Sequence, residues 1–134
     1  MERALEEVVW RRAAGRCEYC QMSQALYNVP FQIDHIIAQK HDGLTELDNL
    51  ALTCLHCNRY KGPNIAGIDA TTQSISRLFH PRRDEWSLHF RWNGPLLVGR
   101  SEIGRATIAV LRMNHRVYLA VRARLIDEGT FPPR

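Results

Sequence analysis

The chain has 134 residues, which is enough for one compact domain but not for two independent domains of ordinary size. Hydrophobic residues make up 45% and charged residues 24%, as in ordinary globular proteins, and no apolar run approaches the length of about eighteen residues that would indicate a membrane-spanning helix. The formal net charge is +4, and the excess of basic residues lies in the second half of the chain.

The first predicted element is a helix over residues 2–14. Apolar residues recur there at helical spacing, acids occupy the first turns, and Gly15 supplies the stop. The opening MERALEEVVW carries acids where an export signal needs a basic start and a long apolar core. We therefore expect an intracellular, cytoplasmic protein.

The central stretch predicts two strands and a helix. Residues 31–37 form an apolar run interrupted by Asp34 and His35, and a glycine-containing turn follows at residues 41–43. A second strand is expected over residues 47–53, and a short helix should begin near Asn58. The expected order is strand, loop, strand, cysteine turn and helix.

The segment that follows is less regular. Residues 63–85 contain proline, glycine, asparagine and aspartate at short intervals, so we expect mostly loop. Residues 86–92 alternate aromatic or aliphatic side chains with polar ones, which predicts a half-buried strand packed in a core. The dipeptide at 93–94 is Asn-Gly, which predicts a hairpin turn leading into residues 96–98.

Two helices are expected at the end of the chain. Ser101 is a suitable N-cap for the first. The second would bury Val117, Val121 and Leu125 and stop at Gly129.

The cysteines predict a structural metal site. All four fall in two Cys-x-x-Cys pairs, Cys17 with Cys20 and Cys54 with Cys57. Without an export signal this pattern favours metal over disulfides, and four thiolates make a closed tetrahedral zinc site. The alternative is a set of buried or redox-active thiols, but a thioredoxin-like motif needs a surrounding βαβ pattern that is absent here.

Asp34, His35 and Asn58 predict a second, catalytic site. The Asp34 carboxylate and the Asn58 amide oxygen are hard ligands that suit Mg²⁺ or Mn²⁺ better than zinc. His35 neighbours Asp34 in a strand, so it points to the other face and is free to act as a general base. The bland alternative is a hydrogen-bonded core histidine beside a turn-capping aspartate, which the combined motif disfavours.

The stretch from Phe31 to Gly62 resembles the HNH endonucleases, whose fold is the ββα-metal fold. The family pattern is an acid-His pair, a central Asn and a final His or Asn, often with Cys-x-x-Cys pairs around it. Asp34-His35 matches the opening pair, Asn49 the central residue and Asn58 the last position, which makes this the HNN variant. The later residues also resemble, more weakly, the tail of small stand-alone bacterial HNH proteins, so we expect a bacterial or phage source.

The resemblance implies a role for each residue. His35 would activate water for attack on a phosphodiester, and Asp34 and Asn58 would hold one divalent ion. Asn49 would tie the connecting loop so that His35 keeps its orientation. Asn58 in place of a final His should shift the metal preference toward Mg²⁺ and Mn²⁺.

The partner that these features predict is DNA. Residues 77–134 carry eleven basic and five acidic side chains, although sixteen of the eighteen basic residues of the chain are arginine, which a GC-rich genome alone would produce. Ordinary solvated surface charge is the alternative for each basic residue. The expected nucleic-acid contacts are Lys61, Arg59, His41, Arg82 and Arg83.

The sequence as a whole predicts a single α+β domain over residues 1–134. Its ββα-metal (HNH, treble-clef-like) core would span residues 15–67 with the four-cysteine zinc knuckle, preceded by a helix and followed by a hairpin and helices over residues 77–129. We expect an endonuclease acting on DNA, with no membrane and no small-molecule substrate. A zinc-dependent nucleic-acid-binding module without cleavage is the alternative, and a zinc-stapled protein-interaction domain a more distant one; oligomeric state and base specificity stay open.

Overall fold

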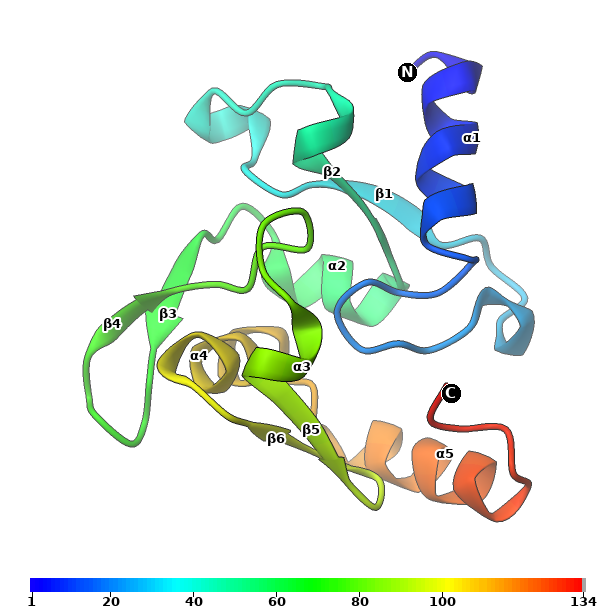
Figure 1. Ribbon diagram of the computed structural model, residues 1–134, viewed down its shortest axis with the longest axis vertical. Helices are drawn as coiled ribbons and strands as arrows, with labels where there is room; N and C mark the ends of the chain where they lie inside the picture. The colour runs from blue at the N-terminus through cyan, green and yellow to red at the C-terminus, as the bar shows by residue number, and fades with distance from the viewer. Residues whose placement is uncertain (134) are drawn as a thin grey trace. The chain divides into compact units, whose positions relative to one another are not determined.

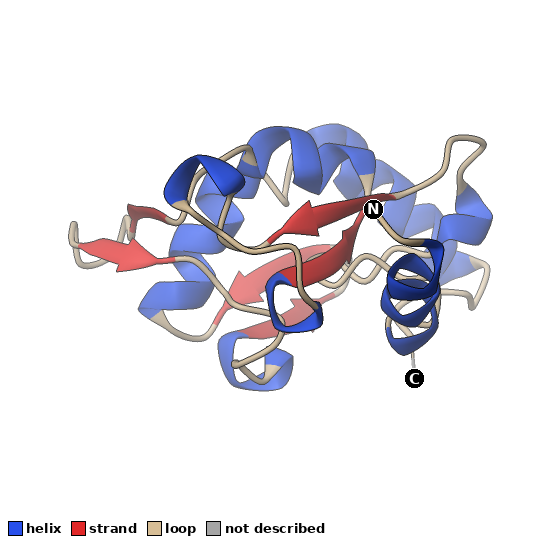
Figure 2. Cartoon of the chain, turned by 90° about the horizontal axis from the view of Figure 1, so that it is seen from above, coloured by secondary structure: helices blue, strands red, loops and turns tan. Residues whose placement is uncertain are grey.

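The computed structural model describes residues 1–133, which divide into two compact units. Unit 1 comprises Met1–Ile65 and His80–Asp84, and unit 2 comprises Ala66–Phe79 and the chain from Glu85 onward. The single domain expected over residues 1–134 stays a prediction. Within the described part of the chain the strands form three two-stranded sheets, drawn in red in Figure 2, and no helix is long and apolar enough to cross a membrane.

Unit 1 contains the ββα core. Strands β1 and β2 pair antiparallel, with Asp34 opposite Ala51 and His35 opposite Leu50. Helix α2 follows β2 directly and packs against β1 (Figure 1). The helices and strands of the unit are α1 (Arg3–Arg12), β1 (Gln32–His35), β2 (Leu50–Thr53) and α2 (Leu55–Lys61).

The expected α+β fold is confirmed, but the boundaries of its core differ from the prediction. β1 occupies only the middle of the apolar run at 31–37, and the first three residues of the predicted second strand form a short 3₁₀ turn, Leu47–Asn49. α2 begins at Leu55, earlier than expected, because the Cys54 thiol caps the helix by accepting a hydrogen bond from the Cys57 backbone N–H.

β2 is the buried centre of unit 1. All four of its residues are buried, because β1 pairs with it and α1 packs on it. Val9 of α1 is fully buried. The Arg12 guanidinium at the end of that helix donates hydrogen bonds to the carbonyl oxygens of Leu47 and Leu50. The predicted N-terminal helix therefore docks onto the core hairpin through both apolar and polar contacts.

Unit 2 is built around helix α4. This helix packs against the β3–β4 hairpin and against β6, and the Thr107 hydroxyl on it accepts a hydrogen bond from the Phe79 backbone N–H at 2.8 Å. The elements of the unit, labelled in Figure 1, are β3 (Ala66–Ile68), β4 (Ile75–Arg77), α3 (Trp86–His89), β5 (Phe90–Asn93), β6 (Leu96–Gly99), α4 (Glu102–Leu111) and α5 (Arg116–Asp127).

One sequence prediction for the segment after the core is confirmed and the next is wrong. Residues 63–85 are mostly loop, as expected, although they also contain the short paired strands β3 and β4. Residues 86–92 are not one strand, since Trp86–His89 form a helical turn and only the last part of the segment belongs to β5. Leu88, which the alternating pattern placed in the core, is 61% exposed.

The other predictions for unit 2 are largely confirmed. The Asn-Gly turn joins β5 to β6, and the Ser101 hydroxyl caps α4 by accepting from the Gly104 N–H at 3.0 Å. α5 ends before Gly129, as expected. Its buried face differs from the prediction, because Val117 and Val121 are exposed while Arg122 is buried.

Candidate active site

The four cysteines form one cluster in unit 1. They are all buried, and their sulfur atoms lie within 4.8 Å of one another. A zinc–sulfur bond of about 2.3 Å at tetrahedral angles places the sulfurs about 3.8 Å apart, and the Sγ atoms of Cys20 and Cys54 are separated by 3.7 Å. The donor set and its spacing therefore fit a closed structural zinc site.

The electrostatics of the cluster also favour a cation. Burial raises the pKa of the Cys17 thiol, but hydrogen bonds from the other three cysteines outweigh it and bring that pKa well below its usual range. Hydrogen bonding to Cys17 raises the pKa of Cys20 and of Cys57 well above theirs. A bound metal ion would favour the deprotonated form of its thiol ligands.

Glu18, between the first two cysteines, ties the cluster to the hairpin. Its backbone N–H donates to the Leu52 carbonyl at 2.9 Å, and its carboxylate accepts from the Leu52 N–H at 2.8 Å. The same carboxylate pairs with the Arg82 guanidinium. The first cysteine turn is thereby fixed to β2, the strand that leads into the second turn.

Asp34 faces helix α2 and pairs with Lys61. The Lys61 Nζ lies 2.9 Å from Asp34 Oδ2, and the two side chains are only 2% and 9% exposed. Lys61 also donates to the His35 carbonyl oxygen at 3.3 Å. Burial raises the pKa of Asp34, while the Lys61 ammonium lowers it. The Oδ2 atom is enclosed beneath Lys61. The Oδ1 atom is not enclosed in this way and accepts no hydrogen bond from a described residue.

Asn58 lies on the same face of α2 as Lys61. Its amide Nδ2 donates to Gln32 Oε1, and Gln32 precedes Asp34 by two residues in β1, so both β1 side chains point toward the helix. No described residue donates a hydrogen bond to Asn58 Oδ1. Folding therefore brings the two oxygen donors expected for Mg²⁺ or Mn²⁺ to the same side of the hairpin.

His35 has a different environment. Its Nε2 lies 2.8 Å from the Thr45 hydroxyl, and the side chain is partly exposed. Within residues 1–133, no group bonds the other ring nitrogen, Nδ1, and that atom is not enclosed. The imidazole therefore presents one nitrogen to solvent, as a general base requires.

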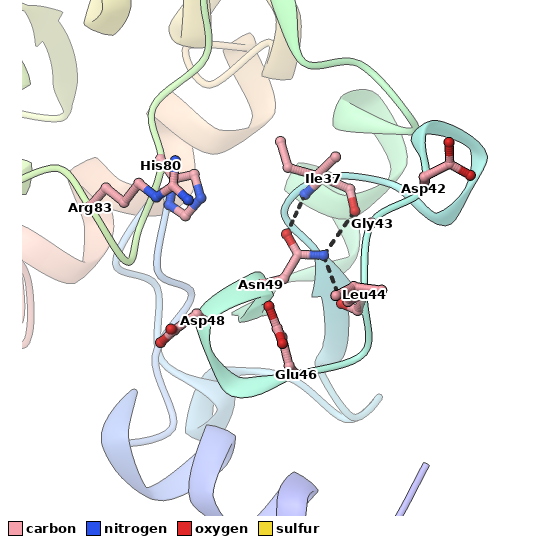
Figure 3. Close-up of a pocket in the computed structure, with 9 residues that line it drawn as sticks. All are labelled: Ile37, Asp42, Gly43, Leu44, Glu46, Asp48, Asn49, His80 and Arg83. Atoms are coloured by element: carbon pink, nitrogen blue, oxygen red, sulfur yellow. Dashed lines mark hydrogen bonds between the residues drawn. The ribbon is translucent and has the colours of Figure 1, made fainter.

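Asn49 closes the loop between the two strands. Its side chain accepts from the Ile37 N–H at 2.8 Å and donates to the carbonyl oxygens of Ile37 at 3.0 Å and Leu44 at 2.9 Å (Figure 3). Asn49 is only 7% exposed. A single buried amide thus joins the start and the end of the loop, which is the geometry expected of the central asparagine.

The matching family model is that of the HNH endonucleases, and it covers residues 17–64. Those residues contain the cysteine cluster, both strands of the core hairpin and helix α2. Residues 17–64 are an HNH endonuclease domain. The resemblance inferred from the sequence is confirmed at the level of the family.

One curated protein is similar to most of this chain. The chain is 24% identical over 152 aligned residues to the Septu protein PtuA of Bacillus mycoides, in a match that covers 92% of this chain. The chain spans about a fifth, 21%, of the length of that relative. No solved structure matches the chain significantly.

The basic residues expected to contact nucleic acid differ in exposure. Arg59 on α2, His41 in the loop of the HNH domain and Arg83 in the 80–84 segment are exposed. Arg82 is paired with Glu18, and burial, together with Arg12 to a smaller degree, lowers the pKa of Arg82 to about 10. Lys61 is enclosed with Asp34, so the geometry does not support a direct phosphate contact by its ammonium.

The loop of the HNH domain also lines a small pocket of about 270 Å³. Asn49 lies at its wall, and His80 and Arg83 approach from the 80–84 segment (Figure 3). The lining residues are Ile37, Asp42, Gly43, Leu44, Glu46, Asp48, Asn49, His80 and Arg83. His35 and Asp34 do not line it.

Sequence reasoning missed two residues that shape the HNH site, Thr45 and Glu18, and the packing role of a third, Gly43. Thr45 contacts His35, Glu18 fixes the first cysteine turn, and Gly43 allows the loop to close, since a Cβ at that position would lie 1.7 Å from the Ile37 carbonyl oxygen. The glycine was visible as part of a turn. Thr45 and Glu18 carry no motif signal of their own.

Proposed function

We propose that this chain is a metal-dependent endonuclease that hydrolyses DNA phosphodiester bonds, with His35 as the general base and Asp34 and Asn58 as ligands of one divalent ion. The observation that carries the proposal is the arrangement in the ββα core. Asp34 Oδ1 and Asn58 Oδ1 are hard donors on the α2 side of β1 that accept no hydrogen bond from a described residue, and the neighbouring His35 presents an open Nδ1.

The chain's own residues have separate parts in this reaction. His35 Nδ1 takes the proton from the attacking water, since an imidazole can accept a proton near neutral pH. Asn49 keeps the loop around His35 closed. Lys61 holds Asp34 through Oδ2 and leaves Oδ1 for the metal. A bound Mg²⁺ or Mn²⁺ would supply positive charge that stabilises the phosphorane and the departing 3′ oxygen.

The choice of ion follows from the ligands. Carboxylate and amide oxygens suit Mg²⁺ and Mn²⁺, while four thiolates suit zinc. We therefore assign zinc to the cysteine cluster as structural support and the hard cation to Asp34 and Asn58. A cluster of four thiolates has no open position for substrate, so its part is to hold the domain together.

DNA as the substrate is supported by the charge of unit 2. The sequence of unit 1 carries nine basic and nine acidic residues, whereas unit 2 carries nine and five, so the whole net charge of +4 belongs to unit 2. In unit 1, Arg59, His41 and Arg83 are exposed and are the phosphate contacts that we propose there. Contacts of this kind make binding fall steeply with salt.

A plasmid-nicking assay tests the proposal. Purified protein is incubated with supercoiled plasmid and either EDTA, Mg²⁺ or Mn²⁺, beside the His35→Ala variant. We expect nicked or linear product only with metal and only with His35 present, and equal DNA binding by both proteins. Binding without cleavage at any metal concentration would instead identify the chain as a non-catalytic nucleic-acid-binding module.

A further inference from the structure

The His35 imidazole makes its one described hydrogen bond to a residue outside the family motif. The Thr45 hydroxyl lies 2.8 Å from Nε2, ten residues further along the chain. Thr45 is exposed and therefore has little part in the packed core. The position of its side chain is therefore set by the backbone of the loop between β1 and β2.

Asn49 hydrogen-bonds the backbone close to both residues of this contact, His35 and Thr45. The Asn49 amide donates to the carbonyl oxygen of Leu44, the residue immediately before Thr45, at 2.9 Å. The same side chain bonds both the N–H and the carbonyl of Ile37, two residues after His35. The backbones that carry the imidazole and the hydroxyl are thus fixed to one buried group.

We infer that Thr45 is the positioning residue through which Asn49 orients the general base, and that its hydroxyl fixes the tautomer with the proton on Nε2. This inference rests on the proposed role of His35. A neutral imidazole has one N–H and one lone pair. If Nε2–H donates to Thr45 Oγ1, the lone pair is on Nδ1, the nitrogen that faces solvent.

The hydroxyl suits this task because it serves both states of the ring. Nε2 carries a hydrogen before and after Nδ1 takes a proton from water, so Thr45 Oγ1 accepts the same hydrogen bond throughout. The opposite tautomer would place the hydrogen on Nδ1 and remove the base. As an acceptor from Nε2–H the Thr45 hydroxyl stabilises the productive form, whereas donation from the hydroxyl to an unprotonated Nε2 would stabilise the opposite tautomer.

The activity test compares Thr45→Val, which keeps the side-chain shape and removes the hydroxyl, with Thr45→Ser, which keeps the hydroxyl. The exposed Thr71→Val in unit 2 is the matched control. With protein in excess over supercoiled plasmid and Mn²⁺ present, we expect Thr45→Val to nick about 10- to 100-fold more slowly. Plasmid affinity should be unchanged, and Thr45→Ser should restore most of the rate.

A spectroscopic measurement separates this inference from the nuclease proposal. Long-range ¹⁵N–¹H correlation of His35 at pH 8 distinguishes the protonated from the unprotonated ring nitrogen, and it needs no catalysis. We expect the Nε2–H tautomer in the wild type and in Thr45→Ser, and a mixture in Thr45→Val. If the wild type showed this tautomer pattern but no nicking, the nuclease proposal would be refuted and the inferred contact between Thr45 and His35 would stand.

Two results would overturn the inference itself. One is an Nδ1–H tautomer in the wild type, or the same tautomer population in Thr45→Val. The other is a Thr45→Val variant that nicks at the wild-type rate under conditions in which His35→Ala is inactive. This result would show that His35 acts as the base without help from Thr45.

Discussion

Replacing Lys61 with methionine removes one charge from an enclosed ion pair and nearly conserves the length of the side chain. The partner Asp34 keeps its carboxylate, with Oδ2 enclosed and no cation beside it. Removing one member of a buried pair costs more than the pair itself contributes, because the remaining charge has lost both water and its partner. We therefore expect Lys61→Met to destabilise unit 1 strongly.

The structure sets the size of the effect. The two side chains are 2% and 9% exposed, so the range for breaking a buried pair applies, about 3–5 kcal/mol. With a urea dependence of about 2 kcal/mol per molar, the unfolding midpoint should fall by about 2 M. Urea titration followed by circular dichroism, at constant zinc and without Mg²⁺ or Mn²⁺, measures this shift.

The loss should also depend on pH. Burial raises the pKa of Asp34, and removal of the Lys61 charge raises it further. A carboxyl whose folded pKa exceeds its unfolded value binds more protons in the folded state, so the protein loses stability as pH rises between the two values. The difference between Lys61→Met and the wild type should therefore be larger at pH 8 than at pH 5.

Two control variants test whether the loss of stability comes from the buried ion pair. Arg59→Met removes an exposed charge from the same helix and should cost less than about 1 kcal/mol. The double variant Asp34→Asn/Lys61→Met removes both charges and should recover most of the lost stability. A Lys61→Met protein with the wild-type midpoint, or a double variant no more stable than the single one, would show that the pair is not energetically coupled.

Three further predictions follow from other contacts. Cys54→Ser should release zinc, measured by elemental analysis, and lower the melting temperature of unit 1; retained zinc would argue against coordination by this thiol. Gly43→Ala should disrupt the loop that Asn49 closes and abolish nicking, since its Cβ would lie 1.7 Å from the Ile37 carbonyl oxygen; an active variant would show that the loop yields. In unit 2, hydrogen bonds from Arg105 hold the pKa of Asp69 well below its usual range. The ionised carboxylate therefore stabilises the folded state above about pH 4, and this contribution is lost as the pH falls further. Asp69→Asn should lower the melting temperature at pH 7 and not at low pH, and an equal loss at both would refute the assignment.

Sequence reasoning succeeded where local chemistry determines structure. The Cys-x-x-Cys pairs, the Asn-Gly turn and the Ser101 cap each specify a local geometry that tertiary packing did not override. The central Asn49 was also assigned its loop-closing geometry, because the family pattern already implied that task.

The hairpin β3–β4 could not be predicted from apolar periodicity because its pattern is reversed. Its inward side carries Gly67, where a Cβ would lie 2.4 Å from Val110 of α4, while Ile68 and Ile75 are 51% and 77% exposed. Close approach of a helix selects small residues on the packed side, so the apolar residues lie outside. The sequence of this hairpin therefore shows no apolar face that would mark it as a packed pair of strands.

The helical turn Trp86–His89 was misread for a related reason. The apolar residues of the segment alternate as in a strand, yet Trp86 packs on Phe90 with ring centroids 5.1 Å apart, a contact between residues four apart. In the site, the partners of His35 and Asp34 were not recognisable, because Thr45 and Lys61 meet them only after the loop and α2 have folded.

The amide of Asn49 has a consequence for how this fold can diversify. Because it clasps Ile37 and Leu44 directly, the short segment between them is closed at its base like a ring. Residues 39–42 are exposed and lie within that ring. They form a stretch whose sequence can change while the His35 imidazole keeps its position.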